Sequence, residues 1–307
     1  MAFTAKDVQT LRERTGVGMM ECKKALSETD GDMEKAIDVL REKGLAKAAK
    51  KAGRIAAEGV AFATVYEDKK VGVVVEVNSE TDFVAKNPQF QAFVADIANT
   101  IADTNPANVE ELLTKPCGEA ESVTAALQEK ILVIGENMTV RRFVRYEGDC
   151  VAYVHGGGRI GVLVRFEADG AIAGSGAMVE CGKDVAMQIA ALNPNYLSKD
   201  TVPEADVEHE RKLQIAEIKN DPKNANKPDQ IIEKMVEGKL RKFFEENCLL
   251  QQAFVKDGNV TVEQYINDCA KKVGGTLKLV DYTRFEKGEG LQKREDDFAA
   301  EVASMMG

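Results

Sequence analysis

The sequence predicts an α+β protein of several domains, and three features of its pattern support this class. Apolar residues recur at helical spacing through residues 1–55, whereas from Val60 onward the period becomes that of β-strands. A strand pair followed by a helix then occurs twice along the chain. A later helical stretch is interrupted by prolines, which predicts two helices running back along each other. This order is typical of antiparallel sheets with separate helices and not of a doubly wound sheet.

Residues 1–55 are predicted to form an N-terminal three-helix bundle. Thr4 and Asp7 have the spacing of a capping box at the start of the first helix. The end of this region is basic, because residues 41–54 hold six Lys and Arg against one Glu. We interpret this segment as a solvated linker helix or as a dock for an acidic protein surface, with nucleic-acid binding the weakest alternative.

Residues 56–145 are predicted to form the first half of a core. The segments 60–66 and 71–77 are apolar strands separated by a charged turn, as in a β-hairpin. Asn87 and Pro88 then supply the cap and the first residue of a helix.

Residues 146–194 repeat this pattern. Strands at 151–154 and 161–167 flank a glycine-rich turn, and a helix follows them. Gly72 and Gly161 occupy equivalent positions when the two copies are aligned. We therefore expect two similar subdomains, each with an antiparallel sheet and a helix.

Residues 195–247 are predicted to form an inserted helical-hairpin, or coiled-coil, arm. Residues 220–228 contain two prolines and several Asn and Asp, so they form the loop between the two helices. Such an arm could serve oligomerisation or partner contact, or its apolar stripe could pack only within the pair.

Residues 248–288 are predicted to complete the second subdomain. Thr261 and Gln264 have the spacing of a capping box, and residues 277–285 resemble a strand. Residues 289–307 form a C-terminal module whose helix carries an apolar stripe of Phe298, Val302 and Met305.

Composition restricts the function classes. The chain has 41 basic and 51 acidic residues, and its net charge of −10 argues against general binding to nucleic acid or to anionic membranes. No apolar run approaches the roughly 18 residues of a membrane span. The N-terminus lacks the layout of a secretion signal. The six dispersed cysteines fit reduced thiols in the cytoplasm, and two histidines leave little material for a metal or catalytic cluster. We therefore expect no metal, no cofactor and no enzyme in the bond-making sense.

One motif could suggest a nucleotide enzyme. Gly156, Gly158 and Gly161 match the dinucleotide fingerprint G-x-G-x-x-G. These glycines lead into a strand, however, whereas a pyrophosphate site requires them to open a helix. We interpret them as a hairpin turn, with the neighbouring His155 available for partner contact. An NAD-type enzyme using this loop is the first rival hypothesis.

Residues 78–87 connect the first hairpin to its helix and form a loop or a single helical turn. Thr81 is a suitable N-cap, and Asp82 follows it at the start of the turn. Phe83 could pack into the core, or it could be an exposed aromatic wedge with a carboxylate beside it. The residues alone leave both interpretations open.

Several well-spaced motifs resemble bacterial translation elongation factor EF-Ts. They include residues 11–26, the Thr-Asp-Phe-Val sequence at 81–84 and residues 155–163. The resemblance continues through residues 234–238, 284–290 and 297–302, and so covers essentially the whole chain in order. One departure is Ala253, where the resemblance leads us to expect Pro.

The resemblance implies a guanine-nucleotide exchange factor for the GTPase EF-Tu. The bundle would then be ubiquitin-associated-like, and Asp82 and Phe83, with Thr81 and Val84, would enter EF-Tu near its magnesium and switch region. Ile134 and Gly135 would contact EF-Tu beside Phe83. Further contacts are expected from Arg12, Met19, Met20, His155 and the C-terminal helix.

Several points stay open at this level. EF-Tu is the expected partner, with no direct nucleotide binding and no membrane contact. The arm could form a homodimer or a 2:2 complex. A ribosome- or RNA-associated protein acting through residues 41–54 is the alternative function, and the acidic balance of the chain argues against it.

Overall fold

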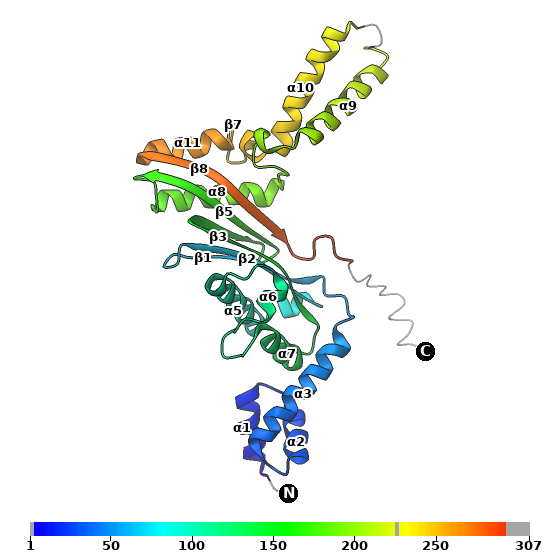
Figure 1. The fold of residues 1–307 in the computed structure, drawn as a ribbon, viewed down its shortest axis with the longest axis vertical. Helices are drawn as coiled ribbons and strands as arrows, with labels where there is room; N and C mark the ends of the chain where they lie inside the picture. Colours follow the sequence, from blue (N-terminus) through cyan, green and yellow to red (C-terminus); the bar gives the residue numbers. More distant parts are fainter. Residues whose placement is uncertain (1–2, 225–226, 293–307) are drawn as a thin grey trace.

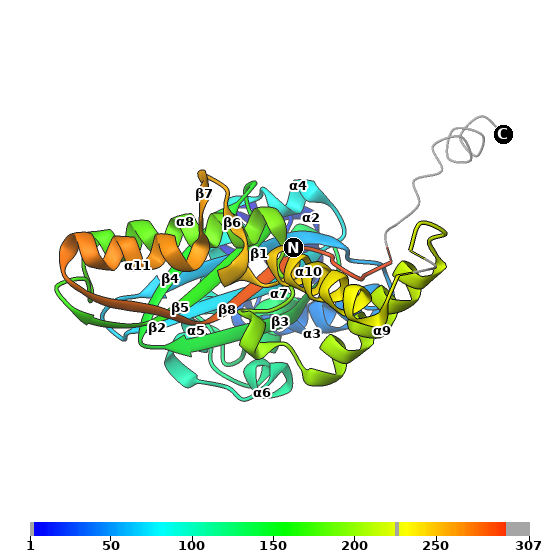
Figure 2. The ribbon, with the colours of Figure 1, turned by 90° about the horizontal axis from the view of Figure 1, so that it is seen from above.

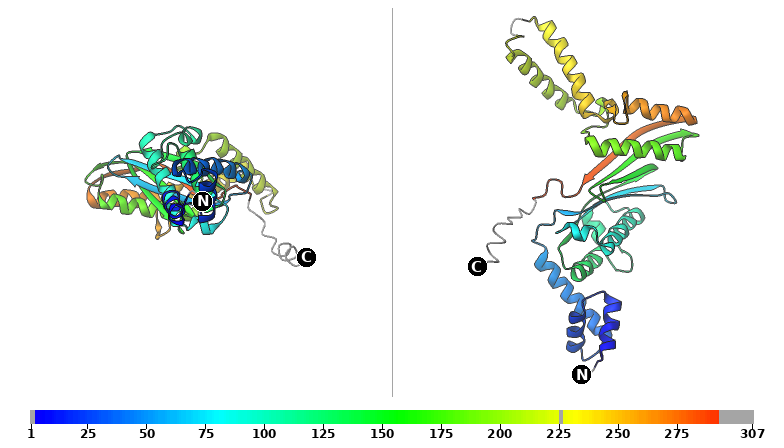
Figure 3. Two further views of the ribbon diagram at one scale, coloured as in Figure 1. Left: turned by 90° about the horizontal axis from the view of Figure 1, so that it is seen from below. Right: turned by 180° about the vertical axis from the view of Figure 1, so that it is seen from behind.

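The computed structural model describes residues 3–224 and 227–292. Its parts succeed one another along the long axis of the molecule (Figure 1). The N-terminal bundle is followed by a helix layer, two facing sheets, a second helix layer and the helical arm; the view from behind shows the same order (Figure 3). The mixture of helices and small antiparallel sheets confirms the α+β class. The predicted helix around Phe298, Val302 and Met305 lies outside the described residues.

The first 51 residues form three helices around a small core of their own. The helices are α1 (Ala5–Thr15), α2 (Met19–Glu28) and α3 (Met33–Lys51). The predicted capping box is confirmed, since the Thr4 and Asp7 side chains each bind the backbone amide of the other residue. Leu11, Leu26 and Cys22 are fully buried between the helices. The basic segment lies in α3 as far as Lys51, so the bundle and most of the linker share one long helix.

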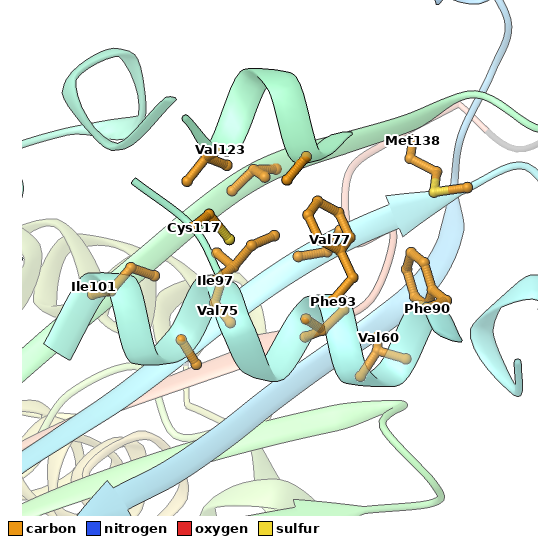
Figure 4. Packing of buried hydrophobic residues seen from close by; sticks show 14 of the residues in the cluster. Val60, Val75, Val77, Phe90, Phe93, Ile97, Ile101, Cys117, Val123 and Met138 are labelled. Carbon is orange, nitrogen blue, oxygen red and sulfur yellow. The ribbon is translucent and has the colours of Figure 1, made fainter. Parts of the chain in front are cut away.

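The first sheet is antiparallel and has the order β1-β2-β3. Its strands are β1 (Glu58–Tyr66), β2 (Val71–Ser79) and β3 (Met138–Glu147). Helices α5 (Pro88–Thr104), α6 (Val109–Leu113) and α7 (Val123–Ile134) cover one face. Phe90, Phe93 and Ile97 of α5 fill the space above the valines of β2 (Figure 4). The predicted cap is confirmed, because the Asn87 side chain accepts from the amide of Gln89 and Pro88 begins the helix.

The second sheet is also antiparallel, with the order β4-β5-β8. Its strands are β4 (Asp149–His155), β5 (Ile160–Gly170) and β8 (Gly275–Glu286). Helices α8 (Gly176–Leu192) and α11 (Val262–Val273) lie side by side across its outer face (Figure 2). Their apolar faces pack against the strands, with Val185, Ile189 and Ile266 buried. The capping box of Thr261 and Gln264 is confirmed.

The inner faces of the two sheets pack directly against each other. Gly72 of β2 and Gly161 of β5 lie at this contact, and a Cβ atom on Gly161 would stand 2.9 Å from the carbonyl oxygen of Ala61. A Cβ atom on Gly72 would stand 2.6 Å from Leu163. The equivalent glycines of the two copies therefore let the sheets approach, and small apolar residues fill the remaining interface. The interface residues are Ala61, Ala63, Val74, Cys150, Leu163 and Phe285.

Each sheet also carries a β-bulge opposite its central strand. The register shifts between Glu76 and Val77 in β2, and between Arg165 and Phe166 in β5. Both shifts follow the interface glycine at the same distance along the strand, which supports the predicted repeat. In the first sheet the extra residue is Arg141, so that consecutive arginines of β3 can both reach Glu76.

Glu76 is a fully buried carboxylate at the centre of β2. It accepts hydrogen bonds from Arg141 at 2.9 Å, from Arg142 at 2.6 Å and from the amide of Gly288 at 2.8 Å. Burial opposes ionisation, but these bonds and one from Asn78 outweigh it and lower the pKa of Glu76. The ionised carboxylate thereby ties the segment after β8 to the first sheet.

The arm projects from the second helix layer (Figure 1). It consists of α9 (Glu204–Asn220) and α10 (Asp229–Asn247). Short 3₁₀ turns lie at its base (Lys199–Thr201 and Leu249–Gln251), and β6 (Ala253–Phe254) pairs with β7 (Asp257–Thr261) beyond it. Ile218, Ile232, Val236 and Leu240 are buried between the two helices. The apolar stripe therefore packs within the pair, while Leu213 and Ile231 stay exposed.

The sequence predicted both hairpins, the long helices, the arm and the strand at β8, and the structure confirms them. It did not predict α6, α7, β3 or the β6–β7 pair. The β3 strand carries several arginines, which hide its alternation; two of them turn inward to Glu76. The boundaries of the domains stay predictions.

Gly161→Ala should lower the free energy of unfolding by about 1–3 kcal/mol, because the added methyl group meets backbone across the sheet interface. Gly238→Ala is the matched control: it lies within α10 with no atom near the added methyl group, and should raise stability by about 0.5–1 kcal/mol. Chemical denaturation of both variants measures the difference. Equal effects of the two substitutions would contradict the close approach of the sheets.

Glu76→Gln should lower the free energy of unfolding at pH 7 by about 3 kcal/mol, because it leaves two arginines without their buried anion. The pKa of Glu76 is lower in the folded chain than its ordinary value of 4.5. Its stabilisation is thus complete above pH 4.5 and is lost as the pH falls through the folded-state pKa. The difference in the free energy of unfolding between wild type and variant should become smaller below pH 4.5. Denaturation at pH 7 and at acid pH measures this difference. A gap that does not depend on pH would contradict this role.

Candidate partner-binding site

Several chain segments meet at one end of the two sheets. Glu58 of β1 pairs with Ser79 of β2, so the start of one strand and the end of the other lie together. The amide of Ala61 donates to the carbonyl of Gly158 at 2.8 Å, which brings the β4–β5 turn to the same end. The end of β8 joins them, since Lys287 pairs with Glu58. We call this end of the sheets the rim.

The Thr-Asp-Phe-Val sequence forms a single helical turn at the rim. This turn is α4 (Asp82–Ala85), with Thr81 as its N-cap. Val84 and Ala85 are buried against the core, whereas Phe83 is 81% exposed. The interpretation that Phe83 packs into the core is therefore wrong, and the ring points to solvent. An exposed phenylalanine on a turn this short is available for a partner.

Asp82 lies beside the exposed ring and is half-exposed. Its carboxylate accepts a hydrogen bond from Lys86 at 2.7 Å, one turn further along the chain. This bond lowers the pKa of Asp82, so the carboxylate is ionised at neutral pH. The tip thus combines an apolar ring with a negative charge.

Two carboxylates form hydrogen bonds between this turn and the loop that joins α7 to β3. Glu136 accepts from the amide of Thr81 at 2.9 Å and from its hydroxyl at 2.7 Å. In return, Glu80 accepts from the amide of Asn137 at 2.6 Å. We call Glu80, Thr81, Glu136 and Asn137 the rim clamp.

The end of α3 is bound to the same two segments. The carbonyl of Arg54 accepts from the Asn137 side chain at 2.9 Å, and the Arg54 guanidinium lies 3.4 Å from Glu80. Lys51 donates to the carbonyl of Gly135. Part of the basic segment therefore fixes the bundle to the rim. Lys43 also pairs within the bundle, with Glu28 at 2.7 Å.

Gly135 ends α7 in the left-handed conformation that favours glycine, with a φ of 92°. The next two residues are the clamp residues Glu136 and Asn137, so the structure brings the Ile134–Gly135 pair to the turn that carries Phe83. Ile134 is partly buried and packs against the first core. Contact of Ile134 and Gly135 with a partner stays a prediction.

His155 is exposed at the end of β4, in the turn at the rim. Its Nδ1 lies 2.9 Å from the hydroxyl of Tyr153. Gly156 and Gly157 both have positive φ, as in a tight hairpin turn, and β5 follows them. The interpretation of the G-x-G-x-x-G motif as a hairpin turn is confirmed, because its glycines lead into a strand and not into a helix.

The remaining predicted contacts lie on the bundle. Arg12 is exposed on α1, and Met19 and Met20 are exposed at the start of α2. Figure 1 shows α1 and α2 beyond the helices of the first sheet, whereas the end of α3 reaches the rim. These residues would form a second contact area and not an extension of the first.

Other features of the described residues do not converge on a chemical site. Among residues 3–224 and 227–292, no group of three His, Cys, Asp or Glu side chains could hold a metal ion. Within the same ranges, no helix is long and apolar enough to cross a membrane. A shallow cavity of about 490 Å³ lies between β1 and β4 near Lys70 and Asp149, at the opposite end of the sheets from the rim.

The chain matches known proteins along its whole length. The family model described as Elongation factor TS matches residues 80–289. A protein named Elongation factor Ts from Clostridium perfringens is 49% identical over 308 residues, covering 99% of both chains. Proteins of the same name from Trichlorobacter lovleyi and Clostridioides difficile are 49% and 48% identical, covering 100% and 99% of this chain and 99% of each relative.

These matches define a translation elongation factor that acts by contact with a partner. The chain belongs to the elongation factor Ts family. Membership supports guanine-nucleotide exchange on the GTPase EF-Tu as its function, within protein biosynthesis, and does not favour the RNA-binding alternative.

The residues that hold the turn in place could not be predicted from the sequence. Glu80 is adjacent to the predicted site, but its partner Asn137 is 57 positions away. The local sequence pattern does not show that the segments of Glu80 and Asn137 lie together. Their pairing depends on β3, which the sequence did not predict. The carboxylate of Glu136, next to the predicted Ile134–Gly135 pair, was the nearest available signal.

Proposed function

We propose that this chain promotes GDP release from EF-Tu by inserting Asp82 and Phe83 near the magnesium and switch region of the GTPase. The observation that carries the proposal is the exposure of Phe83, which is 81% exposed on a turn whose base is hydrogen-bonded. Thr81 and Val84 hold this tip from either side, by the N-cap and by burial. Phe83 would part side chains of the GTPase, and the ionised Asp82 would disturb the magnesium-coordinating network.

The energetics require more than one contact. Tight GDP binding depends on magnesium and on backbone donors held around the diphosphate. An exchange factor works by binding better to the GTPase conformation in which those donors are misplaced, and linkage makes the two ligands weaken each other equally. A change from nanomolar to micromolar GDP affinity takes about 4 kcal/mol. A single hot-spot contact supplies roughly 2 kcal/mol, so other surfaces must contribute.

We infer those other surfaces from exposed or partly buried residues that match the family motifs. Ile134, Gly135 and His155 lie on the segments that meet at the rim, so they would touch EF-Tu together with Phe83. Arg12 with the exposed Met19 and Met20 would form the separate contact of the bundle. The C-terminal helix predicted from the sequence, whose residues lie outside those described, would add to these.

The domain division at residues 55, 145, 194, 247 and 288 is likewise part of the proposal. Separate cores in the bundle, the two sheet layers and the arm support it. The five buried cysteines among six free ones support action in the reducing cytoplasm. The chain would bind no nucleotide itself, and its glycine motif supports this because it is a hairpin turn. As an exchange factor it would act by binding and would form or break no covalent bond.

The role of the arm is a proposal of its own. Leu213 and Ile231 are exposed outside the internal core of the arm, so a second copy or EF-Tu could cover them. Light scattering of the chain alone and with EF-Tu would distinguish a homodimer or a 2:2 complex from a 1:1 complex.

Phe83→Ala should lower the maximal rate of GDP release about 30-fold, which is the change that about 2 kcal/mol produces. Part of the binding to EF-Tu should remain, because the other surfaces are intact. Stopped-flow release of a fluorescent GDP, over a range of exchange-factor concentrations, measures both quantities. Val255→Ala, at another exposed apolar side chain, is the control and should exchange at the wild-type rate. An unaltered rate with Phe83→Ala would contradict the proposal that Phe83 acts as a wedge.

The double substitution Met19→Ala with Met20→Ala should mainly weaken association. Each side chain is exposed on a bundle that stays folded, so its loss removes contact area without moving the rim. We expect the half-saturating concentration in the same assay to rise about tenfold, whereas the maximal rate changes little. If the maximal rate falls and the half-saturating concentration is unchanged, the bundle is not a docking surface.

A further inference from the structure

The direction of the Phe83 ring depends on the backbone of its turn. The ring is almost fully exposed, so no core packing of its own fixes it. Below it, Val84 and Ala85 are buried and hold the C-terminal side of the turn. On the N-terminal side Thr81 is held by hydrogen bonds, and its contact with the amide of Val84 is long, at 3.5 Å. What fixes Thr81 therefore decides where Phe83 points.

Glu136 is the group that fixes Thr81 from across the chain. Its carboxylate accepts hydrogen bonds from the Thr81 amide at 2.9 Å and from the Thr81 hydroxyl at 2.7 Å. Bonds to an ionised acceptor are about twice as strong as neutral ones. The bond from the Thr81 hydroxyl also orients the oxygen that caps α4, with its lone pairs toward the amide of Val84. One carboxylate thus sets both the backbone and the cap of the turn.

The opposite half of the rim clamp holds Glu136 in its own place. Asn137, the next residue, donates its amide to Glu80 at 2.6 Å and its side chain to the carbonyl of Arg54 at 2.9 Å. Asn137 is buried, so these bonds are shielded from water. The clamp therefore connects the tip, the end of α7 and the end of α3 in one network.

We propose that Glu136 is a positioning residue for nucleotide exchange, acting through Thr81 to present Phe83. This inference rests on the proposed function of the Asp82–Phe83 tip and adds the residue that orients the tip. Glu136 need not touch EF-Tu to have this effect. Its contribution appears when the tip is inserted, so it should change the maximal exchange rate more than the affinity of docking.

Two substitutions separate the hydrogen bonds from the charge. Glu136→Ala removes both acceptors and should slow maximal GDP release from EF-Tu about tenfold, with a change of about threefold or less in the half-saturating concentration. Glu136→Gln keeps both bonds, since its amide oxygen accepts from the Thr81 amide and its NH₂ can donate to the Thr81 hydroxyl. It should stay within about twofold of the wild-type rate. Glu129→Ala, at an exposed carboxylate of α7, is the matched control and should have no effect.

A double-mutant cycle with Phe83 distinguishes positioning from a general structural role. If Glu136 acts only through the ring, Glu136→Ala should cause no further loss in a Phe83→Ala background. A general loosening of the fold would instead add its effect to that of Phe83→Ala. Thermal unfolding of each variant shows that the chain is folded. Should Glu136→Ala fail to fold, Thr81→Val removes the same hydroxyl bond from the other side and should also lower the maximal rate.

The outcomes separate this inference from the function on which it rests. A wild-type rate for Glu136→Ala, or an additive loss with Phe83→Ala, would overturn the positioning role and leave the wedge in place. If Glu136→Ala cannot be measured, a wild-type rate for Thr81→Val would overturn it. A wild-type rate for Phe83→Ala would overturn the wedge itself, whatever Glu136 does.

Discussion

The close contact of the two sheets determines where every functional segment lies. A Cβ atom on Gly161 would stand 2.9 Å from the backbone of β1, and one on Gly72 would stand 2.6 Å from the Leu163 side chain. These glycines therefore let the two sheets pack closely, and the close packing holds the strands in place. With the strands fixed, their ends are fixed as well. The start of β1, the end of β2, the turn after β4 and the end of β8 meet at one rim, although they come from positions spread over more than two hundred residues.

Buried and partly buried carboxylates then hold this rim together. Glu76 binds two arginines and the segment after β8, whereas Glu80 and Glu136 bind across the turn before α4. Each of these hydrogen bonds joins segments that are distant in sequence. The rim is therefore cross-linked and resists deformation. A firmly held base would suit the proposed role of the Asp82–Phe83 tip, because binding energy would otherwise be lost in bending the tip.

Local patterns predicted much of this structure. Capping boxes at Thr4 and Thr261, the hairpin periodicity and the prolines of the arm depend on neighbours within a few residues, and these predictions were confirmed. The exposure of Phe83 and the clamp around it could not be predicted in the same way. They depend on β3, whose arginines turn inward through a bulge, and on pairings across 55 or more residues. The family resemblance led us to predict a contact at Asp82 and Phe83, and the fold shows which residues support this turn.

The central claim is that this tip stabilises EF-Tu that has released its magnesium. Linkage then requires magnesium and the exchange factor to weaken each other's binding to EF-Tu. The most direct test is to measure the dissociation constant of the chain for EF-Tu by calorimetry over a range of magnesium concentrations, with wild type and with Phe83→Ala. The account predicts that wild-type affinity falls as magnesium rises and that Phe83→Ala flattens this dependence. A wild-type affinity that does not change with magnesium would contradict it.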